Sequence, residues 1–121
     1  QINYGEEGMA DPTLRAELWI KAQVRICDNA MLSAFIRRRG DPDAGAVIIK
    51  LDRLDGFSEV FTQTRTLDGT RAWTRGAGDG LVPDVNAESY IARQAEFDPD
   101  IWVLEIEDPN YRYKFDEPLI I

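Results

Sequence analysis

The spacing of apolar residues in the first part of the chain predicts a helix over residues 11–29. Asp11 is a good N-cap, and Pro12 suits the first helical position, where its missing N–H costs nothing. Apolar residues recur at every fourth position, as one helical stripe would require: Leu14, Leu18, Ala22 and Ile26. Residues 18–26 also alternate as a strand would, but the Asp-Pro start favours the helix.

From Ala34 to Arg75 the pattern changes to short apolar runs separated by turn residues, which predicts strands. The runs AFIRR and AVIIKLDRL are joined by RGDPDAG, so we expect them to form a hairpin. Because AVII is apolar at successive positions, its side chains are apolar on both faces. This strand is therefore expected to lie centrally in the sheet.

Asp68-Gly69 predicts a second tight hairpin, with Leu67 opposite Thr70. In this register one face of the hairpin carries threonines together with Arg71, Trp73 and Arg75. The other face carries Arg65. Neither face is apolar enough to be buried. The hairpin is therefore expected at an edge of the sheet or projecting into solvent, with Trp73 exposed.

A second helix is predicted from Asn86 to Phe97, because the residue before Pro99 is pushed out of the helical region. The residues expected to face inward are Ala87, Ile91 and Ala95 with the Tyr90–Phe97 flank.

The stretches IWVLEIED and YRYKF flank Pro109-Asn110 and predict a third hairpin. In the register that pairs Asp108 with Tyr111, Ile106 meets Tyr113 across the strands. Apolar side chains then lie opposite apolar side chains on one face of the hairpin, as expected if that face is buried.

Together these elements predict an α+β fold, with a mostly antiparallel sheet of about five or six strands and two helices packed on one face. Residues 1–8 show no periodicity, and the stretch up to Met9 back-translates to a purine-rich sequence ahead of a start codon. We expect residues 1–8 to be a non-native or disordered leader. Residues 9–121 are expected to form a single domain.

Three stretches together resemble one known family: ELWIKAQVRIC, RRGDPDAGAVIIKLDRLDG and YIARQAEFDPDIWVLEIED. They are similar to small alphaproteobacterial proteins grouped as domain of unknown function 1491, over residues 14–108. The resemblance implies a compact cytoplasmic bacterial α+β domain. It brings no functional residue with it, because the family has no established activity.

The amino-acid composition limits the kinds of binding and catalysis that are open to this chain. The net charge of −8 argues against broad non-specific binding to nucleic acid or anionic lipid. Histidine is absent, so a general base would have to be a carboxylate or a lysine with a shifted pKa. The single cysteine, Cys27, cannot form an internal disulfide, which predicts a reducing, cytoplasmic setting. No cofactor and no membrane partner are expected, and binding is favoured over catalysis.

The turn in RRRGDPDAG is one candidate site. Strand alternation sends Arg37 and Arg39 to one face, where they could hold a small anionic ligand through a phosphate or carboxylate. Asp41 and Asp43 could ligate Mg²⁺ as a pair of hard oxygen donors. The alternative is that both aspartates neutralise the arginines and hydrogen-bond the turn backbone.

The polar hairpin is the other candidate site. An exposed surface of one aromatic residue and several arginines suits an unknown protein partner or self-association: Arg65, Arg71, Trp73 and Arg75. Alternatively Trp73 folds back over the sheet. The leading hypothesis is a small non-enzymatic binding or interaction module. The other two are a phosphate- or nucleotide-ligand protein at the turn, metal-dependent hydrolases included, and a nucleic-acid-binding module at the hairpin.

Overall fold

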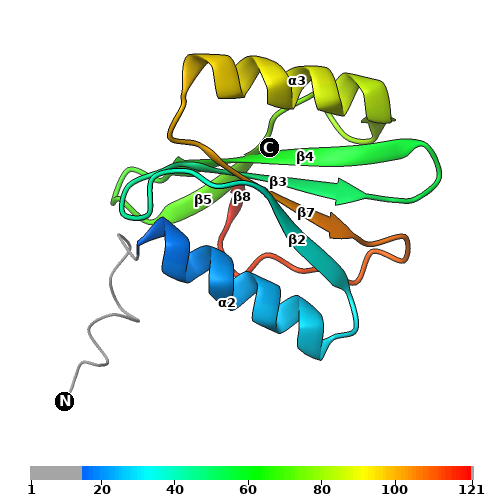
Figure 1. Ribbon diagram of the computed structural model, residues 1–121, viewed down its shortest axis with the longest axis horizontal. Helices are drawn as coiled ribbons and strands as arrows, with labels where there is room; N and C mark the ends of the chain where they lie inside the picture. The colour runs from blue at the N-terminus through cyan, green and yellow to red at the C-terminus, as the bar shows by residue number, and fades with distance from the viewer. Residues whose placement is uncertain (1–14, 121) are drawn as a thin grey trace.

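The computed structural model describes residues 15–120, in which one sheet lies between two helices (Figure 1). The predicted leader, residues 1–8, lies outside the described residues, as do Asp11, Pro12 and Leu14 of the first predicted helix. The elements follow one another as α2 (Ala16–Asn29), β2 (Ser33–Arg38), β3 (Val47–Asp52), β4 (Phe57–Arg65), β5 (Arg71–Arg75), β6 (Val82–Pro83), α3 (Asp84–Phe97), β7 (Trp102–Glu107) and β8 (Leu119–Ile120). Within these residues, neither helix is long and apolar enough to span a membrane.

The strands of the described chain form one mixed sheet of seven strands in the order β2-β7-β3-β4-β5-β8, with β6 against β4. β3 runs parallel to β7 and β5 runs parallel to β8, whereas the other pairs are antiparallel. The α+β class is confirmed, but the prediction of five or six mostly antiparallel strands is wrong. The predicted hairpin between β2 and β3 is also wrong, because β7 lies between them.

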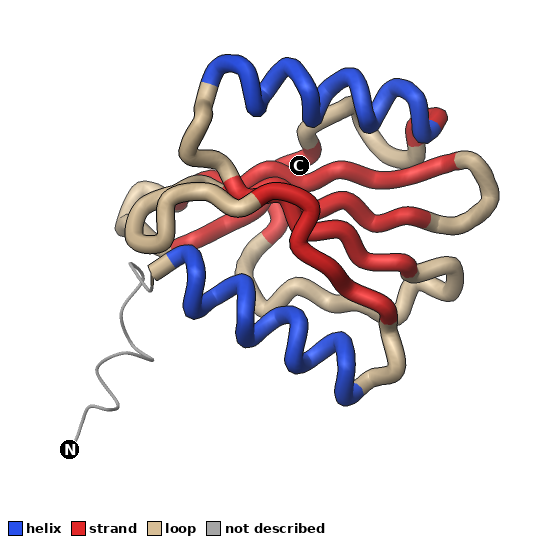
Figure 2. Tube along the Cα trace, viewed as in Figure 1, coloured by secondary structure: helices blue, strands red, loops and turns tan. Residues whose placement is uncertain are grey.

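The two helices cover opposite faces of the sheet, which corrects the prediction that both pack on one face (Figure 2). Successive residues of β3 show this directly: Ile49 packs with the α2 side chains, and Ile48 packs with those of α3. Trp19 and Ile20 anchor α2, whereas Ile91 anchors α3. The AVII run is apolar at successive positions and therefore needs an apolar cover on each face of the sheet, and each helix supplies one.

The buried side of α2 differs from the predicted stripe. The helix begins after Arg15, which makes no side-chain cap. Its buried residues are Ala16, Trp19, Ile20, Gln23 and Cys27. Leu18 and Ile26 remain about half exposed. The larger apolar area of Trp19 sets the rotation of the helix, since the hydrophobic gain scales with the area buried.

The β4–β5 hairpin is shifted by one residue from the predicted register. Arg65 lies opposite Arg71, and Gln63 lies opposite Trp73. The Thr66 N–H donates to the Thr70 carbonyl at 2.9 Å, so the loop has three residues rather than two. A shift of one residue moves a strand's side chains to the other face. Arg65 therefore shares the α2 face with Arg71 and Trp73.

The predicted C-terminal hairpin does not form, because β2 and β3 already occupy both edges of β7. The chain leaves β7 through a turn in which the Asp108 carboxylate accepts the N–H groups of Arg112 and Tyr113, each at 2.8 Å. Residues 109–118 then cross the α2 face of the sheet and bring β8 beside β5 (Figure 1). Tyr113 and Phe115 still face the core, as their apolar character requires.

Candidate functional site

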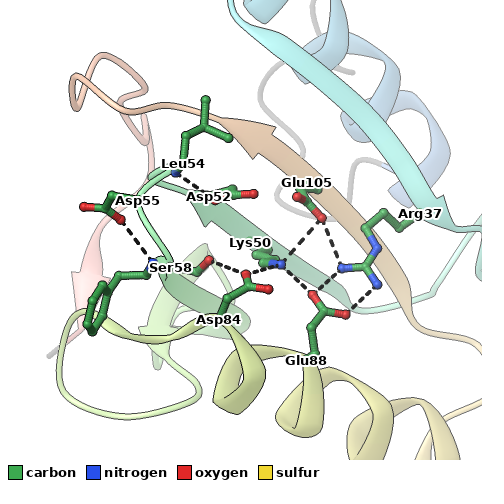
Figure 3. Close-up of polar contacts among 10 residues, drawn as sticks. Arg37, Lys50, Asp52, Leu54, Asp55, Ser58, Asp84, Glu88 and Glu105 are labelled. Atoms are coloured by element: carbon green, nitrogen blue, oxygen red, sulfur yellow. Dashed lines mark hydrogen bonds and ion pairs between the residues drawn. The ribbon is translucent and has the colours of Figure 1, made fainter.

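A cluster of charged side chains lies between the sheet and the first turns of α3 (Figure 3). Lys50, in the central strand β3, is almost completely buried. Its ammonium lies 2.7 Å from an Asp84 oxygen and 2.5 Å from a Glu88 oxygen. Asp84 and Glu88 are four residues apart on α3 and therefore lie on the same helical face.

Arg37 joins this cluster from β2. Its guanidinium binds both Glu88 oxygens at 2.7 Å and one Glu105 oxygen at 3.1 Å. The side chain reaches α3 because strand alternation places Arg37 on the same face as Phe35, which is paired with Glu105. The cluster thus connects β2, β3 and β7 to α3.

The electrostatics of this cluster favour fixed charge over proton transfer. The hydrogen bond from Arg37 lowers the pKa of Glu88 to about 2. Burial opposes the charge on Lys50, but hydrogen bonds to Asp84 and Glu88 raise its pKa. An acid–base catalyst needs a pKa near the working pH, and these changes move Lys50 and Glu88 away from it. Burial raises the pKa of Glu105, but Arg37 and Lys50 both lie beside its carboxylate. Because the charged groups pair with one another and connect α3 to three strands, we assign the cluster a structural role, holding α3 on the sheet.

The turn after β2 packs closely against the start of β7. Gly40 and Gly45 both abut the Asp100 carbonyl, and a Cβ at either position would also meet the Trp102 ring. The Trp102 indole N–H donates to the Asp41 carbonyl at 2.7 Å. Glycine at these two positions therefore allows the backbone of the turn to lie close to the backbone at the start of β7.

The residues predicted for this turn do not converge on one site. Arg37 faces α3, whereas the bulge in β2 turns Arg39 to the other face, where it lies 3.7 Å from Glu17 of α2. The Asp41 carboxylate accepts the backbone N–H groups of Asp43 and Ala44, as in an Asx turn. Asp43 pairs with Arg15 at 3.4 Å. No group of three metal-donor side chains occurs among residues 15–120.

Trp73 is fully buried, so the expectation that it is exposed is wrong. Its ring lies 5.2 Å from the Trp19 ring, and its indole N–H donates to Glu117 at 3.1 Å. The shifted register places Trp73 beneath α2, where the helix covers it. Arg75 pairs with Glu59 at 2.7 Å and lies over the Phe61 ring.

Arg65 and Arg71 instead line a cavity of about 260 Å³. Its other walls are Gln63 of β4, Ala16 at the start of α2, and the turn residues 43–45. Arg71 is buried, with its guanidinium 5.0 Å from the Trp19 ring centre. Burial lowers the pKa of Arg71, Glu117 raises it, and the neighbouring charge of Arg65 lowers it. Arg65 donates to the Gly69 carbonyl at 2.9 Å.

Both arginines of this cavity were candidates from the sequence, but the predicted register placed them on opposite faces. The charged cluster under α3 was not predicted, although the sequence holds one signal for it. Lys50 follows directly after the AVII run of a strand expected to be central. A lysine in such a strand is rarely buried unless it is paired, which predicts acidic partners nearby.

Cys27 is expected to resist thiol reagents in the folded protein. It is fully buried, and burial, followed by the charge of Asp28, raises its pKa to about 11. Only the thiolate reacts, so iodoacetamide at about pH 8 should label the native protein far more slowly than the denatured one. Equal labelling rates, measured by intact mass, would contradict the burial of Cys27.

Comparison with known proteins matches the chain to one family model and to several solved structures. The family model described as "Protein of unknown function (DUF1491)" matches residues 14–116. The crystal structure of a DUF1491 family protein from Caulobacter crescentus CB15 has a TM-score of 0.79 and 34% identity, over 88% of this chain and 99% of that chain. An NMR structure of a DUF1491 family protein from the same organism gives 0.77 and 34%, over 90% and 98%.

The solution structure of protein Atu0922 from A. tumefaciens is similar in fold, with a TM-score of 0.65 and 23% identity over 79% of this chain and 86% of that chain. No curated protein matches the chain. Because the family model covers most of the sequence, this chain belongs to the DUF1491 family, whose function is unknown.

Proposed function

We propose that the chain is a non-enzymatic binding protein that takes a small anionic ligand, through a phosphate or carboxylate group, in the cavity between Arg65 and Arg71. One observation carries the proposal. The two arginines are directly opposite one another on adjacent strands, and both line the same cavity. Guanidinium groups donate paired hydrogen bonds to phosphate and carboxylate oxygens, so two of them in one cavity suit such an anion.

The surroundings of the cavity support this choice. Ala16 is the first residue of the 14-residue helix α2, so the positive end of the helix dipole lies at the cavity wall. The stacking of Arg71 on Trp19 holds that guanidinium in place before a ligand arrives, which reduces the entropy lost on binding. Asp43 also lines the cavity and opposes an anion on its side. The anion is therefore expected next to the arginines.

Binding is favoured over catalysis because the chain has no histidine and Glu88 is held ionised by Arg37 and Lys50. Two arginines in a small cavity suit a compact anion better than the extended backbone of a nucleic acid, which the net charge of −8 repels. The single buried Cys27 suits a reducing compartment, so we also propose a cytoplasmic location.

Inorganic phosphate is expected to raise the melting temperature above that in sodium chloride of the same ionic strength. A ligand at about 100 times its dissociation constant adds about 2.7 kcal/mol, which corresponds to several degrees in a domain of this size. Acetate and phosphoserine extend the panel to carboxylates and phosphate monoesters. Arg65→Gln should remove most of the shift, and isothermal titration calorimetry should show affinity weakened at least about tenfold.

Arg71→Lys tests the second arginine while keeping the charge, since a lysine cannot reproduce the planar guanidinium. Arg93→Gln, on the exposed side of α3, is the matched control and should keep the full shift. Absence of any anion-specific shift would overturn the proposal. A shift of unchanged size in both Arg65→Gln and Arg71→Lys would overturn it as well.

A further inference from the structure

We propose that α2 docks against α2 of a second copy of this chain, through a ridge formed by Leu18, Ala22 and Ile26. Leu18 and Ile26 are 47% and 49% exposed, on a helix whose opposite side is buried. Ala22 lies between them and is also exposed. This inference does not rest on the anion cavity, which lies at the start of the helix.

The surface beside the ridge has the shape that helix packing requires. The ridge follows an i, i+4, i+8 row, and a second row is formed by Lys21 and Arg25. A groove of about 370 Å³ is lined by these two rows. In the commonest packing class such a row of one helix lies in the groove next to the same row of the other helix, so the two ridges run side by side.

The order of side-chain sizes along the ridge favours a second copy as the occupant. A dimer with twofold symmetry uses the same patch on both subunits, so the patch must complement itself. In an antiparallel pair centred on Ala22, Leu18 of one copy meets Ile26 of the other. The small side chain of Ala22 at the centre allows the helix axes to approach within about 8–10 Å.

The charges beside the ridge fit the same arrangement. Glu17, Lys21 and Arg25 follow one another every four residues. Under a twofold axis these flanks lie side by side, so Arg25 of each copy approaches Glu17 of the other. Glu17 already lies 3.6 Å from Lys21 and 3.7 Å from Arg39 within its own copy, and so has cationic neighbours on several sides. Lys21 faces its own counterpart near the axis.

Lys21 therefore distinguishes a second copy from other occupants. An acidic protein segment or an anionic lipid surface would be attracted by Lys21, and its removal would weaken binding. In the twofold arrangement Lys21 is repelled by its counterpart, and its removal strengthens binding. The two kinds of occupant thus predict opposite signs for one substitution.

Sedimentation velocity over about 10–300 µM tests the proposal, a range suited to interfaces below the standard size. The wild-type chain should shift from monomer toward dimer across the series. Ala22→Arg should abolish the shift while far-UV circular dichroism stays unchanged, because the position is exposed and arginine is a good helix former. Lys21→Ala should lower the dissociation constant several-fold. Ala92→Arg, on the exposed side of α3, is the matched control and should dimerise like the wild type.

A wild-type chain that stays monomeric over the whole series would overturn the proposal. Loss of dimer in Ala92→Arg, or weaker association in Lys21→Ala, would overturn it too. A monomer that cosediments with phosphatidylglycerol vesicles through Leu18 and Ile26 would assign this face to a lipid surface instead.

Discussion

Alanine at Gly40 is expected to lower the free energy of unfolding by about 3 kcal/mol or more. The added Cβ would lie 2.7 Å from the backbone carbon of Ile101 and 2.7 Å from the Trp102 ring, and against the Asp100 carbonyl oxygen. Backbone atoms at the start of a central strand cannot move aside. The turn must therefore lift away from β7, which breaks the 2.9 Å hydrogen bond from the Asp41 N–H to Asp100.

Chemical denaturation of purified protein measures this effect, and Gly80→Ala is its matched control. Nothing lies within 4 Å of a Cβ built at Gly80, so that variant should unfold within about 0.5 kcal/mol of the wild type. Gly45→Ala should resemble Gly40→Ala, because its Cβ meets the same carbonyl. A Gly40→Ala chain with an unchanged denaturation midpoint would show that the turn does not contact β7 as described.

Glu88→Gln is expected to destabilise the protein at neutral pH and to reduce its sensitivity to acid. The folded pKa of Glu88 is lowered from 4.5 to about 2, so its stabilisation is complete above 4.5 and is lost as the pH falls toward 2. Such a difference in pKa corresponds to about 3 kcal/mol at full strength. Because the side chain is 37% exposed, solvent screening reduces this to about 1–2 kcal/mol.

Urea denaturation between about pH 2 and 7 checks the sign of this effect. Burial raises the pKa of Glu105, which acts in the opposite direction as the pH falls. Because Glu105 shares Arg37 with Glu88, the difference between variant and wild type measures the two coupled carboxylates together. The difference should be largest at pH 7 and should shrink below about pH 4. Glu96→Gln, on the exposed side of α3, should leave the curve unchanged. A constant difference at all pH values would argue against a charge effect.

Local patterns predicted the elements better than their arrangement. The second helix ends at Phe97, as the proline after Asp98 required, and the AVII strand lies centrally. The β4–β5 register failed by one residue because Gly69 alone takes a positive φ, +87°, in a loop of three residues. Burial of Trp73 under α2 favours that register, and no local turn signal reports it.

Tertiary contacts decided which of the predicted site residues lie close together in the structure. Alternation predicted that Arg37 and Arg39 share a face, but a bulge at Arg37 separates them. Bulges depend on the partner strand, which here is distant in sequence. Arg65 and Arg71 were singled out for their charge, and only the shifted register brought them together. The residues were visible in the sequence, whereas their juxtaposition depended on tertiary contacts.

The position of β7 between β2 and β3 has a consequence for synthesis of the chain. When β2, β3 and β4 have left the ribosome, the place between β2 and β3 is still empty, because residues 102–107 are made much later. The nascent chain therefore exposes two unpaired strand edges until most of it has been translated. Pairings so distant in sequence form slowly, so β2 joins the rest of the sheet only after β7 has been made.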